Sequence, residues 1–200
     1  MSSPMLNIID ALEADKFAIA PHFLPEQLAQ TILEEMRVLW DGNHFNEAKV
    51  GQLTQTKRHS EIRSDFIYWL EEPYLTLSQR MYWQKIESLR HCLNRHFFLG
   101  ISTFEAHFAI YPIGAFYKRH LDQHKGSNRR QISCILYLNP DWLPQDGGQL
   151  RLFPNRGQWD NFVDVLPEAG TLVCFRCDSI YHEVLPASRR RYSITGWLGY

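Results

Sequence analysis

The chain has 200 residues, 44% of them hydrophobic, and a formal net charge of -1 at pH 7. This length and composition can bury one sizeable core, so we expect one domain and exclude the disordered and fibrous classes. A charge near zero gives no attraction for nucleic acid or an anionic membrane, and no apolar run reaches the length of a membrane span. The first residues lack the basic and apolar pattern of a signal peptide, which predicts a cytoplasmic location.

The first hundred residues are predicted to be mostly helical, because apolar residues recur there at helical spacing. The predicted helices are residues 6–12, 25–40 and 74–98. Short strands are expected at residues 17–20 and at the end of residues 62–70. The polar residues 44–60 predict a loop over a binding groove, since long loops are often binding elements or lids.

The second hundred residues change character, with short strand-like runs separated by turn signals such as Asp146-Gly147-Gly148. The predicted strands are residues 104–112, 116–122, 131–138, 149–153, 162–166, 171–176, 181–185 and 191–200. This pattern predicts a mainly β fold with flanking helices (α+β). The architecture that we expect is a jelly roll, or double-stranded β-helix, in which two sheets close over a cavity and the N-terminal helices support one sheet.

His120 and Asp122 lie two residues apart in a predicted strand, so both side chains point to the same side while Leu121 points away. With His182 from a later strand, they form a ligand set for non-haem Fe(II). Two imidazoles and one carboxylate leave positions on the metal open for oxygen and substrate. Arg191 follows nine residues after His182, and a buried arginine can hold a dicarboxylate through two parallel hydrogen bonds.

Strand alternation predicts which other side chains share this cavity. One face of the last strand carries Arg191, Ser193, Thr195 and Trp197, and one face of residues 131–138 carries Ser133, Ile135 and Tyr137. The face of the last strand is too polar for an ordinary core. Hydroxyl groups of Tyr137 and Thr195 can complete the hydrogen bonding of a small dicarboxylate that Arg191 anchors.

Several residues have competing interpretations. His124 continues the alternation after His120 and Asp122, and so it is an alternative third ligand. The spacing of Cys174 and Cys177 fits a redox or zinc site, but also fits two thiols packing in a strand. The remaining histidines, for which we expect structural roles, are His22, His44, His59, His91, His96 and His107. The charged residues Asp178, Glu183, Arg189 and Arg190 are expected at the surface.

Nine segments together carry a resemblance to a known family. They are residues 23–24 with the predicted helix that follows, and residues 62–71, 111–112, 117–122, 134–139, 141–142, 147–154, 182–187 and 191–197. Through them, nearly the whole chain resembles the Fe(II)/2-oxoglutarate-dependent prolyl hydroxylases of the hypoxia-inducible-factor type, including their prokaryotic members. The Ile-Arg-x-Asp sequence at residues 62–65 and the nine-residue spacing from His182 to Arg191 point to this branch of the superfamily.

The resemblance implies roles for particular residues. His120, Asp122 and His182 match the catalytic iron ligands, Arg191, Tyr137, Thr195 and Tyr111 match the 2-oxoglutarate pocket, and Arg63 and Asp65 match a segment beside the substrate groove. The implied cofactors and co-substrates are Fe(II), 2-oxoglutarate and O2, with ascorbate as a candidate stimulant. Residues 1–200 then form a single catalytic domain. In it, residues 1–100 give helical support and the substrate loop, and residues 101–200 give the jelly-roll core with the metal and co-substrate site.

The implied activity is hydroxylation of a prolyl residue, at the 4-position, in a protein substrate. Elongation factor Tu is the candidate partner because prokaryotic members of the family act on it. The same chemistry on another protein residue or on a free amino acid is an alternative, as are a metal-binding sensor or scaffold without turnover and a purely structural jelly roll. We also expect Asp65 to pair with Arg130 and so fix its segment to the neighbouring strand.

Overall fold

The computed structural model describes residues 4–48, 61–123 and 129–200. Three α-helices lie within the described part of the first hundred residues. They are α1 (Pro4–Asp15), α2 (Glu26–Asp41) and α3 (Leu77–Phe97). Helix α3 begins three residues later than predicted because Thr76 caps it: the Thr76 hydroxyl accepts from the Gln79 amide, and the Gln79 side chain accepts from the Thr76 amide. The preceding residues Glu72–Tyr74 form a short 3-10 turn, η1.

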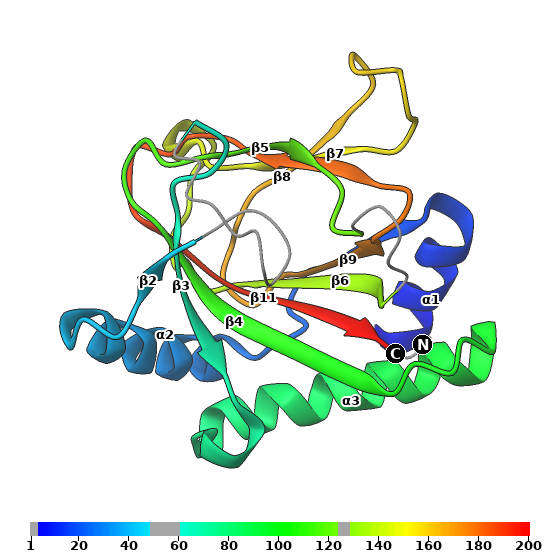
Figure 1. Cartoon of the computed structure of the whole chain (residues 1–200), viewed down its shortest axis with the longest axis horizontal. Helices are drawn as coiled ribbons and strands as arrows, with labels where there is room; N and C mark the ends of the chain where they lie inside the picture. The colour runs from blue at the N-terminus through cyan, green and yellow to red at the C-terminus, as the bar shows by residue number, and fades with distance from the viewer. Residues whose placement is uncertain (1–3, 49–60, 124–128) are drawn as a thin grey trace.

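The strands form two antiparallel sheets (Figure 1). The larger has the order β1 (Phe17–Ala20), β9 (Leu172–Arg176), β6 (Arg130–Tyr137), β11 (Arg191–Gly199), β4 (Thr103–Tyr111), β3 (Phe66–Leu70) and β2 (Asn46–Glu47). The smaller has the order β5 (Tyr117–His120), β10 (Tyr181–Val184), β7 (Leu150–Phe153) and β8 (Val163–Val165). A second 3-10 turn, η2, spans Pro144–Asp146. Each of the eight runs predicted in the second half of the chain overlaps one strand, although β4 and β6 each begin one residue earlier than predicted.

One hydrophobic cluster lies between the larger sheet and the helices, and a second lies between the two sheets. Alternate residues of β6, such as Cys134 and Leu136, face a core between the larger sheet and the helices, which lie along one side of that sheet in Figure 1. The intervening residues Ile135 and Tyr137 face a second cluster, which includes Leu150 of the smaller sheet. The predicted alternation of β6 is therefore correct, and the space between the two sheets is where the candidate site lies.

Strand β5 is shorter than predicted. It ends at His120, so Asp122 lies just beyond the strand and not within it. The pairing of β5 with β10 is also irregular between His182 and Val184. Alternation along one strand therefore does not explain the position of the Asp122 carboxylate, which has to be held by other contacts.

Residues predicted to lie in the loop at 44–60 are only partly described. Asn46 and Glu47 form β2, which pairs with Ile67 and Phe66 at the edge of the larger sheet. Residues 49–60 and His124 lie outside the described residues, so the proposed groove loop and the alternative third ligand are not tested. In the ranges that are described, no helix is both long and apolar enough to cross a lipid bilayer.

The cysteines do not form a C-x-x-C site. All four are free thiols. Cys174 faces Cys134 across the β6–β9 pair, with the two sulfur atoms 3.7 Å apart, whereas Cys177 contacts the hydroxyl of Ser133 at 3.1 Å. Because the two cysteines of the motif have different neighbours, packing explains them better than a redox or zinc site.

The remaining charged residues agree with the predicted surface roles. Asp178 pairs with Arg176 at 2.9 Å, and Glu183 lies 3.9 Å from Arg151. Arg189 pairs with Asp146 at 3.3 Å near the surface. Of the three consecutive arginines 189–191, it is Arg191 that turns inward, with 1% of its surface exposed.

Candidate metal centre and co-substrate pocket

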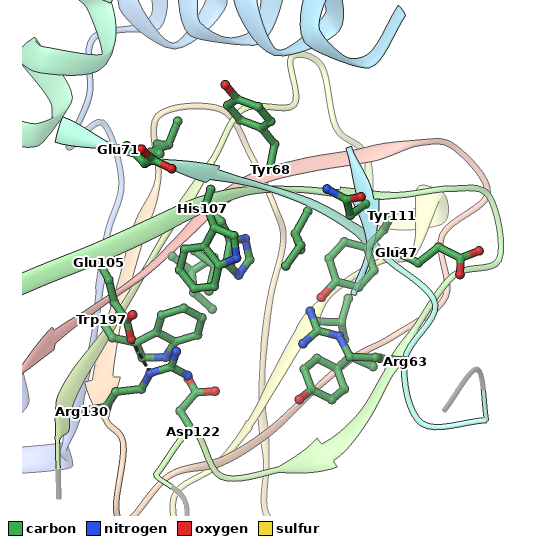
Figure 2. A pocket seen from close by; sticks show the side chains of 18 of the residues that line it. Glu47, Arg63, Tyr68, Glu71, Glu105, His107, Tyr111, Asp122, Arg130 and Trp197 are labelled. Carbon is green, nitrogen blue, oxygen red and sulfur yellow. Dashed lines mark hydrogen bonds and ion pairs between the residues drawn. The ribbon is translucent and has the colours of Figure 1, made fainter. Parts of the chain in front are cut away.

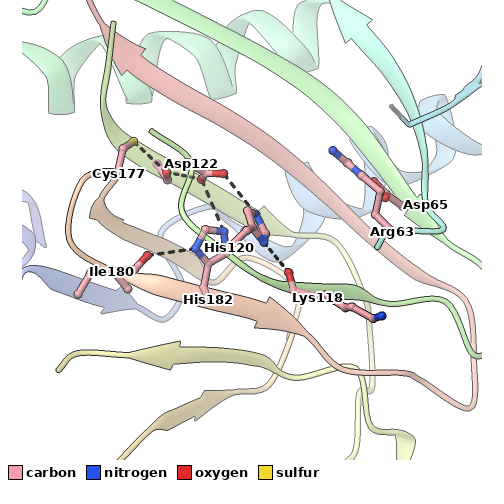
Figure 3. A network of polar contacts seen from close by, with 9 residues as sticks. Arg63, Asp65, Lys118, His120, Asp122, Cys177, Ile180 and His182 are labelled. Atoms are coloured by element: carbon pink, nitrogen blue, oxygen red, sulfur yellow. Dashed lines mark hydrogen bonds and ion pairs between the residues drawn. The ribbon is translucent and has the colours of Figure 1, made fainter. Parts of the chain in front are cut away.

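Three side chains with metal-binding atoms converge between the two sheets. His120 and His182 are directly paired across β5 and β10, and Asp122 follows β5 by two residues. One ligand atom from each residue lies within 4.8 Å of the others. The Nε2 atoms of His120 and His182 are 3.5 Å and 3.7 Å from the two Asp122 carboxylate oxygens (Figure 3). A divalent cation can therefore reach all three groups at once.

Hydrogen bonds fix both imidazole rings in the tautomer that a metal needs. Nδ1 of His120 donates to the carbonyl oxygen of Lys118 at 2.8 Å, and Nδ1 of His182 donates to that of Ile180 at 3.3 Å. Because a carbonyl oxygen can only accept, Nδ1 carries a proton in both rings, and in the neutral form of each ring the lone pair is therefore on Nε2. This is the usual way in which a protein orients a histidine ligand.

The electrostatics of the three groups also favour a cation. Burial alone would raise the pKa of the Asp122 carboxyl, but His182, His120 and the hydroxyl of Ser133 hold this pKa well below its usual range. Burial, together with the neighbouring His120, lowers the pKa of His182 to about 4. At neutral pH the centre therefore presents one ionised carboxylate and an uncharged His182, which is the protonation state that metal binding requires.

The predicted partner of Asp65 is wrong. Asp65 accepts two hydrogen bonds from the Arg63 guanidinium, at 2.8 and 2.6 Å, while Arg130 pairs with Glu105 at 2.7 Å. Arg63 is two residues away on the same side of the chain, so its planar guanidinium reaches both carboxylate oxygens without a long span. The segment is fixed instead by backbone bonds to the β5 region, where the amide of Lys118 donates to the carbonyl of Ile62 at 2.8 Å.

Tyr117 links this segment to the metal centre, and the sequence interpretation missed it. Its ring stacks on the His120 ring with centroids 3.6 Å apart and an interplanar angle of 17°. The Arg63 guanidinium carbon lies 4.3 Å from the centroid of the Tyr117 ring. Alternation places residues three apart on opposite faces, so a regular strand would have separated Tyr117 from His120. The irregular pairing of β5 brings them together.

Arg191 is buried beside the metal centre with part of its hydrogen bonding unused. Its Nε donates to the carbonyl of Gly148 at 3.0 Å, and its Nη1 lies 3.4 Å from the hydroxyl of Ser193. Among the described residues, neither Nη2 of Arg191 nor the hydroxyl of Tyr137 has a partner, although both are buried. A buried unsatisfied donor costs about 1–3 kcal/mol. Two such donors together mark a site for an anionic acceptor.

The tyrosines beside Arg191 remain neutral donors. The Arg191 guanidinium carbon lies 4.9 Å from the centroid of the Tyr137 ring and 5.1 Å from that of Tyr111. Burial raises the pKa of Tyr137 to about 12, although the positive charge of Arg191 opposes this shift. The Tyr137 hydroxyl therefore keeps its proton at physiological pH and can donate it to a carboxylate.

A single pocket of about 1300 Å³ contains most of these groups. Its lining includes the three candidate metal ligands together with Arg191, Thr195 and Tyr111. Tyr137 does not line the pocket and lies against Arg191. Arg63 lines it as well, while Asp65 is buried behind Arg63. The structure thus brings most of the predicted site residues together around one cavity, with Tyr137 and Asp65 buried behind its lining.

Aromatic rings form one wall of this pocket (Figure 2). The ring of His107 lies 5.0 Å from that of Trp69 and 5.5 Å from that of Trp197, and the Arg130 guanidinium covers Trp197 at 3.5 Å. The sequence predicts a structural role for His107, and the structure places its buried ring in the lining of the pocket. The signal that could have found it is alternation along β4, where His107 and Tyr111 share a face.

The tautomer of His107 gives this wall a hydrogen-bond acceptor. Its Nδ1 donates to the carbonyl of Phe108 at 3.1 Å, which leaves the lone pair on Nε2. Burial, with a smaller contribution from Arg63, lowers the pKa of His107 to about 4. The imidazole is therefore neutral at physiological pH.

The lowered pKa of His107 predicts a loss of stability in acid. The unfolded chain protonates this histidine below about pH 6.5, whereas the folded chain does not until about pH 4. Its contribution to the free energy of unfolding is thus complete above pH 6.5 and is lost as the pH falls towards 4. At pH 5 the loss is about 2 kcal/mol. The test is the change in the free energy of unfolding between pH 7.5 and pH 5.0, measured with urea on the metal-free protein. This change should be smaller in His107→Gln than in the wild type, by about 2 kcal/mol. An equal change in both proteins would contradict the lowered pKa of His107.

Comparison with known proteins agrees with this geometry. Residues 106–199 match the family model described as the 2OG-Fe(II) oxygenase superfamily. Prolyl hydroxylase EGLN3 of Mus musculus is 33% identical over 212 residues, which cover 95% of this chain and 81% of that protein. The chain belongs to the 2OG-Fe(II) oxygenase superfamily. Its relatives within the superfamily include prolyl hydroxylases, and members of the superfamily use Fe(II), 2-oxoglutarate and O2.

Further relatives of the chain are also similar over nearly its whole length. Egl nine homolog 1 of Homo sapiens is 34% identical over 198 residues, which cover 95% of this chain but only 45% of that protein, so the chain spans about half the length of that relative. A crystal structure of a Pseudomonas putida prolyl-4-hydroxylase is 39% identical, with a TM-score of 0.87 and 98% of both chains covered. A Trichoplax adhaerens prolyl hydroxylase in complex with a hypoxia-inducible-factor peptide is 29% identical, with a TM-score of 0.86 and coverage of 98% of this chain and 88% of that chain.

Proposed function

We propose that the protein is an Fe(II)- and 2-oxoglutarate-dependent dioxygenase that hydroxylates a prolyl residue, at the 4-position, in a protein substrate. The observation that carries this proposal is the convergence of His120, Asp122 and His182 beside a buried arginine with a free donor. Two imidazoles and one carboxylate suit a ferrous ion, and Arg191 suits the distal carboxylate of a small dicarboxylate. The relatives named above support the prolyl acceptor.

In this proposal each predicted residue has a separate task. The iron ligands are His120, Asp122 and His182; the 2-oxoglutarate residues are Arg191, Tyr137, Thr195 and Tyr111; and the substrate-side residues are Arg63 and Asp65. Iron with 2-oxoglutarate and O2, when bound, supplies the oxidising chemistry. The protein supplies position: Arg191 and the Tyr137 hydroxyl donate to the carboxylate, and the aromatic wall excludes water from the acceptor carbon.

The proposed substrate is a protein rather than a free amino acid. A pocket of about 1300 Å³ is larger than a single proline with 2-oxoglutarate requires, and drug-sized ligands already fill sites of roughly 300–1000 Å³. The neighbour from Trichoplax adhaerens is in complex with a peptide. The resemblance to prokaryotic members makes elongation factor Tu the first candidate target, and a bacterial source is part of this proposal. Another protein residue and a free amino acid are the alternatives that keep the same chemistry.

Two further parts of the proposal concern organisation and location. We treat residues 1–200 as a single catalytic domain because one hydrophobic cluster joins all three helices to the larger sheet. A translation factor as target places the reaction in the cytoplasm. Neither nucleic acid nor membrane is a proposed partner.

Mass spectrometry can test the acceptor directly. The purified protein is incubated with Fe(II), 2-oxoglutarate and either elongation factor Tu or free L-proline, with and without ascorbate. We expect one added oxygen atom on a single prolyl residue of the protein and an equal amount of succinate. Omission of 2-oxoglutarate should remove both signals. Hydroxylation of free proline alone would replace the protein substrate with an amino acid, and absence of substrate-dependent succinate in a metal-loaded sample would favour the sensor or scaffold.

A further inference from the structure

The three candidate metal ligands are held by different parts of the fold. His120 and His182 lie on strands of the smaller sheet. The carboxylate of Asp122, which follows the end of β5, accepts a hydrogen bond of 2.6 Å from the hydroxyl of Ser133 on β6 of the larger sheet. Ser133 has no exposed surface, and Asp122 is 8% exposed. The metal centre therefore bridges the two sheets, and one hydroxyl group makes the connection.

The hydroxyl of Ser133 has a single proton, and this fixes the direction of the hydrogen bonds around it. An ionised carboxylate can only accept, so the single hydroxyl proton of Ser133 points to Oδ2 of Asp122. The other polar neighbour of the hydroxyl is the sulfur atom of Cys177 at 3.1 Å. Since the hydroxyl has no second proton, the thiol of Cys177 donates to its oxygen. The result is a buried chain from Cys177 through Ser133 to Asp122.

Backbone contacts keep Cys177 in this place. Its amide donates to the carbonyl of Gln131 at 3.0 Å, and its carbonyl accepts from the amide of Gln123 at 3.2 Å. The Gln123 side chain in turn donates to the carbonyl of Arg130 at 3.2 Å. The residue that follows Asp122 is thus tied to both β6 and Cys177. Figure 3 shows Cys177 on the Asp122 side of the centre, away from Lys118.

We propose that Ser133 is a positioning residue of the metal centre and that Cys177 aligns its hydroxyl. The hydroxyl fixes the orientation of the Asp122 carboxylate through Oδ2, so that Oδ1 would be available to a metal ion. This inference rests on the proposed function because it takes Asp122 as a metal ligand. Partners that orient metal ligands typically contribute about 10- to 100-fold to metal affinity.

Binding of Mn(II) to the metal-free protein tests the inference without turnover. Free Mn(II) is measured by electron paramagnetic resonance, in the absence of 2-oxoglutarate, at a temperature well below the unfolding transition. Ser133→Ala is expected to raise the dissociation constant about 10- to 100-fold. Ser133→Cys keeps a donor of similar size but weaker strength, so its constant should lie between those of the wild type and Ser133→Ala. Ser78→Ala, which removes another buried hydroxyl that bonds to Glu35 in a different part of the fold, should bind Mn(II) like the wild type.

A double-mutant cycle tests the role of Cys177. If the thiol acts only through the hydroxyl, Cys177→Ala should weaken binding less than Ser133→Ala, and the double variant should bind no more weakly than Ser133→Ala alone. Additive effects would overturn the chain from Cys177. Wild-type affinity in folded Ser133→Ala would overturn the role of Ser133; if that variant does not fold, wild-type affinity in Ser133→Cys would do so. Failure of the wild-type protein itself to bind Mn(II) would instead contradict the proposed function.

Discussion

Replacement of His182 by alanine is expected to remove both metal binding and turnover. His182 is buried, and its Nε2 lies 3.7 Å from the Asp122 carboxylate. Among the described residues, His182 belongs to the one group of three side chains that could hold a metal ion together. Loss of a residue that only orients a ligand costs about 10- to 100-fold in affinity. Loss of the ligand itself should therefore cost more than about 100-fold, and succinate formation should fall to the level of the protein without iron.

Mn(II) binding and succinate formation should be measured on the same preparation of His182→Ala. His96→Ala is the matched control, because its imidazole is exposed and bonds only to Glu13 at 3.3 Å among the contacts described. The control should match the wild type in both measurements. Full Mn(II) affinity in His182→Ala would exclude His182 as a ligand. It would leave His120 and Asp122 with an unidentified third group, for which the sequence offers His124.

The architecture was predictable because each strand of the second half combines alternation with a turn signal. In β6, alternate residues divide between two hydrophobic clusters, as the pattern of Cys134, Ile135, Leu136 and Tyr137 predicts. In β11 the same reasoning placed Arg191, Thr195 and Trp197 in one pocket. Regular strands preserve alternation over many residues, so inferences from sequence are strongest there.

Predictions from the sequence were weaker where the chain leaves a regular strand. Asp122 lies beyond β5, and a hydroxyl from the other sheet holds its carboxylate, a contact between residues eleven positions apart that spacing does not reveal. Tyr117 reaches His120 through irregular pairing. The predicted partner of Asp65, Arg130, was wrong because charge alone does not distinguish Arg63 from Arg130. Geometry decides between them, since the nearer guanidinium reaches both carboxylate oxygens.

Replacement of Arg191 by methionine should abolish binding of 2-oxoglutarate while leaving the metal-free protein about as stable as the wild type. Each charge-assisted hydrogen bond to the carboxylate contributes roughly 1.5–3 kcal/mol. Loss of one such bond weakens binding roughly 10- to 150-fold, and loss of two weakens it further. Methionine has a similar length and no charge, so it fills the space without supplying a donor.

The stability of Arg191→Met should be close to that of the wild type because Arg191 is a buried cation without an ionic partner among the described residues. Desolvation of a charged group costs several kcal/mol even after relaxation, and Arg191 has one unsatisfied nitrogen atom. Its hydrogen bond to Gly148 and its contacts with the rings of Tyr137 and Tyr111 offset part of this cost. Arg191→Met removes both the desolvation cost of the buried charge and the contacts that offset this cost. The free energy of unfolding should therefore change by no more than about 1 kcal/mol, which is the net value of one ordinary hydrogen bond.

Thermal unfolding with and without 2-oxoglutarate separates these effects. In the Mn(II)-loaded wild type, 2-oxoglutarate at 100 times its dissociation constant should stabilise the protein by about 2.7 kcal/mol. Arg191→Met should show no such increase, while its stabilisation by Mn(II) alone should match that of the wild type. Arg190→Met is the control, because Arg190 is exposed and its guanidinium carbon lies 5.4 Å from the ring of Trp40, outside the pocket. If Arg191→Met kept the 2-oxoglutarate response, the buried guanidinium would have a structural role, and the anchor of the co-substrate would have to be sought among the other pocket cations, Arg63 first.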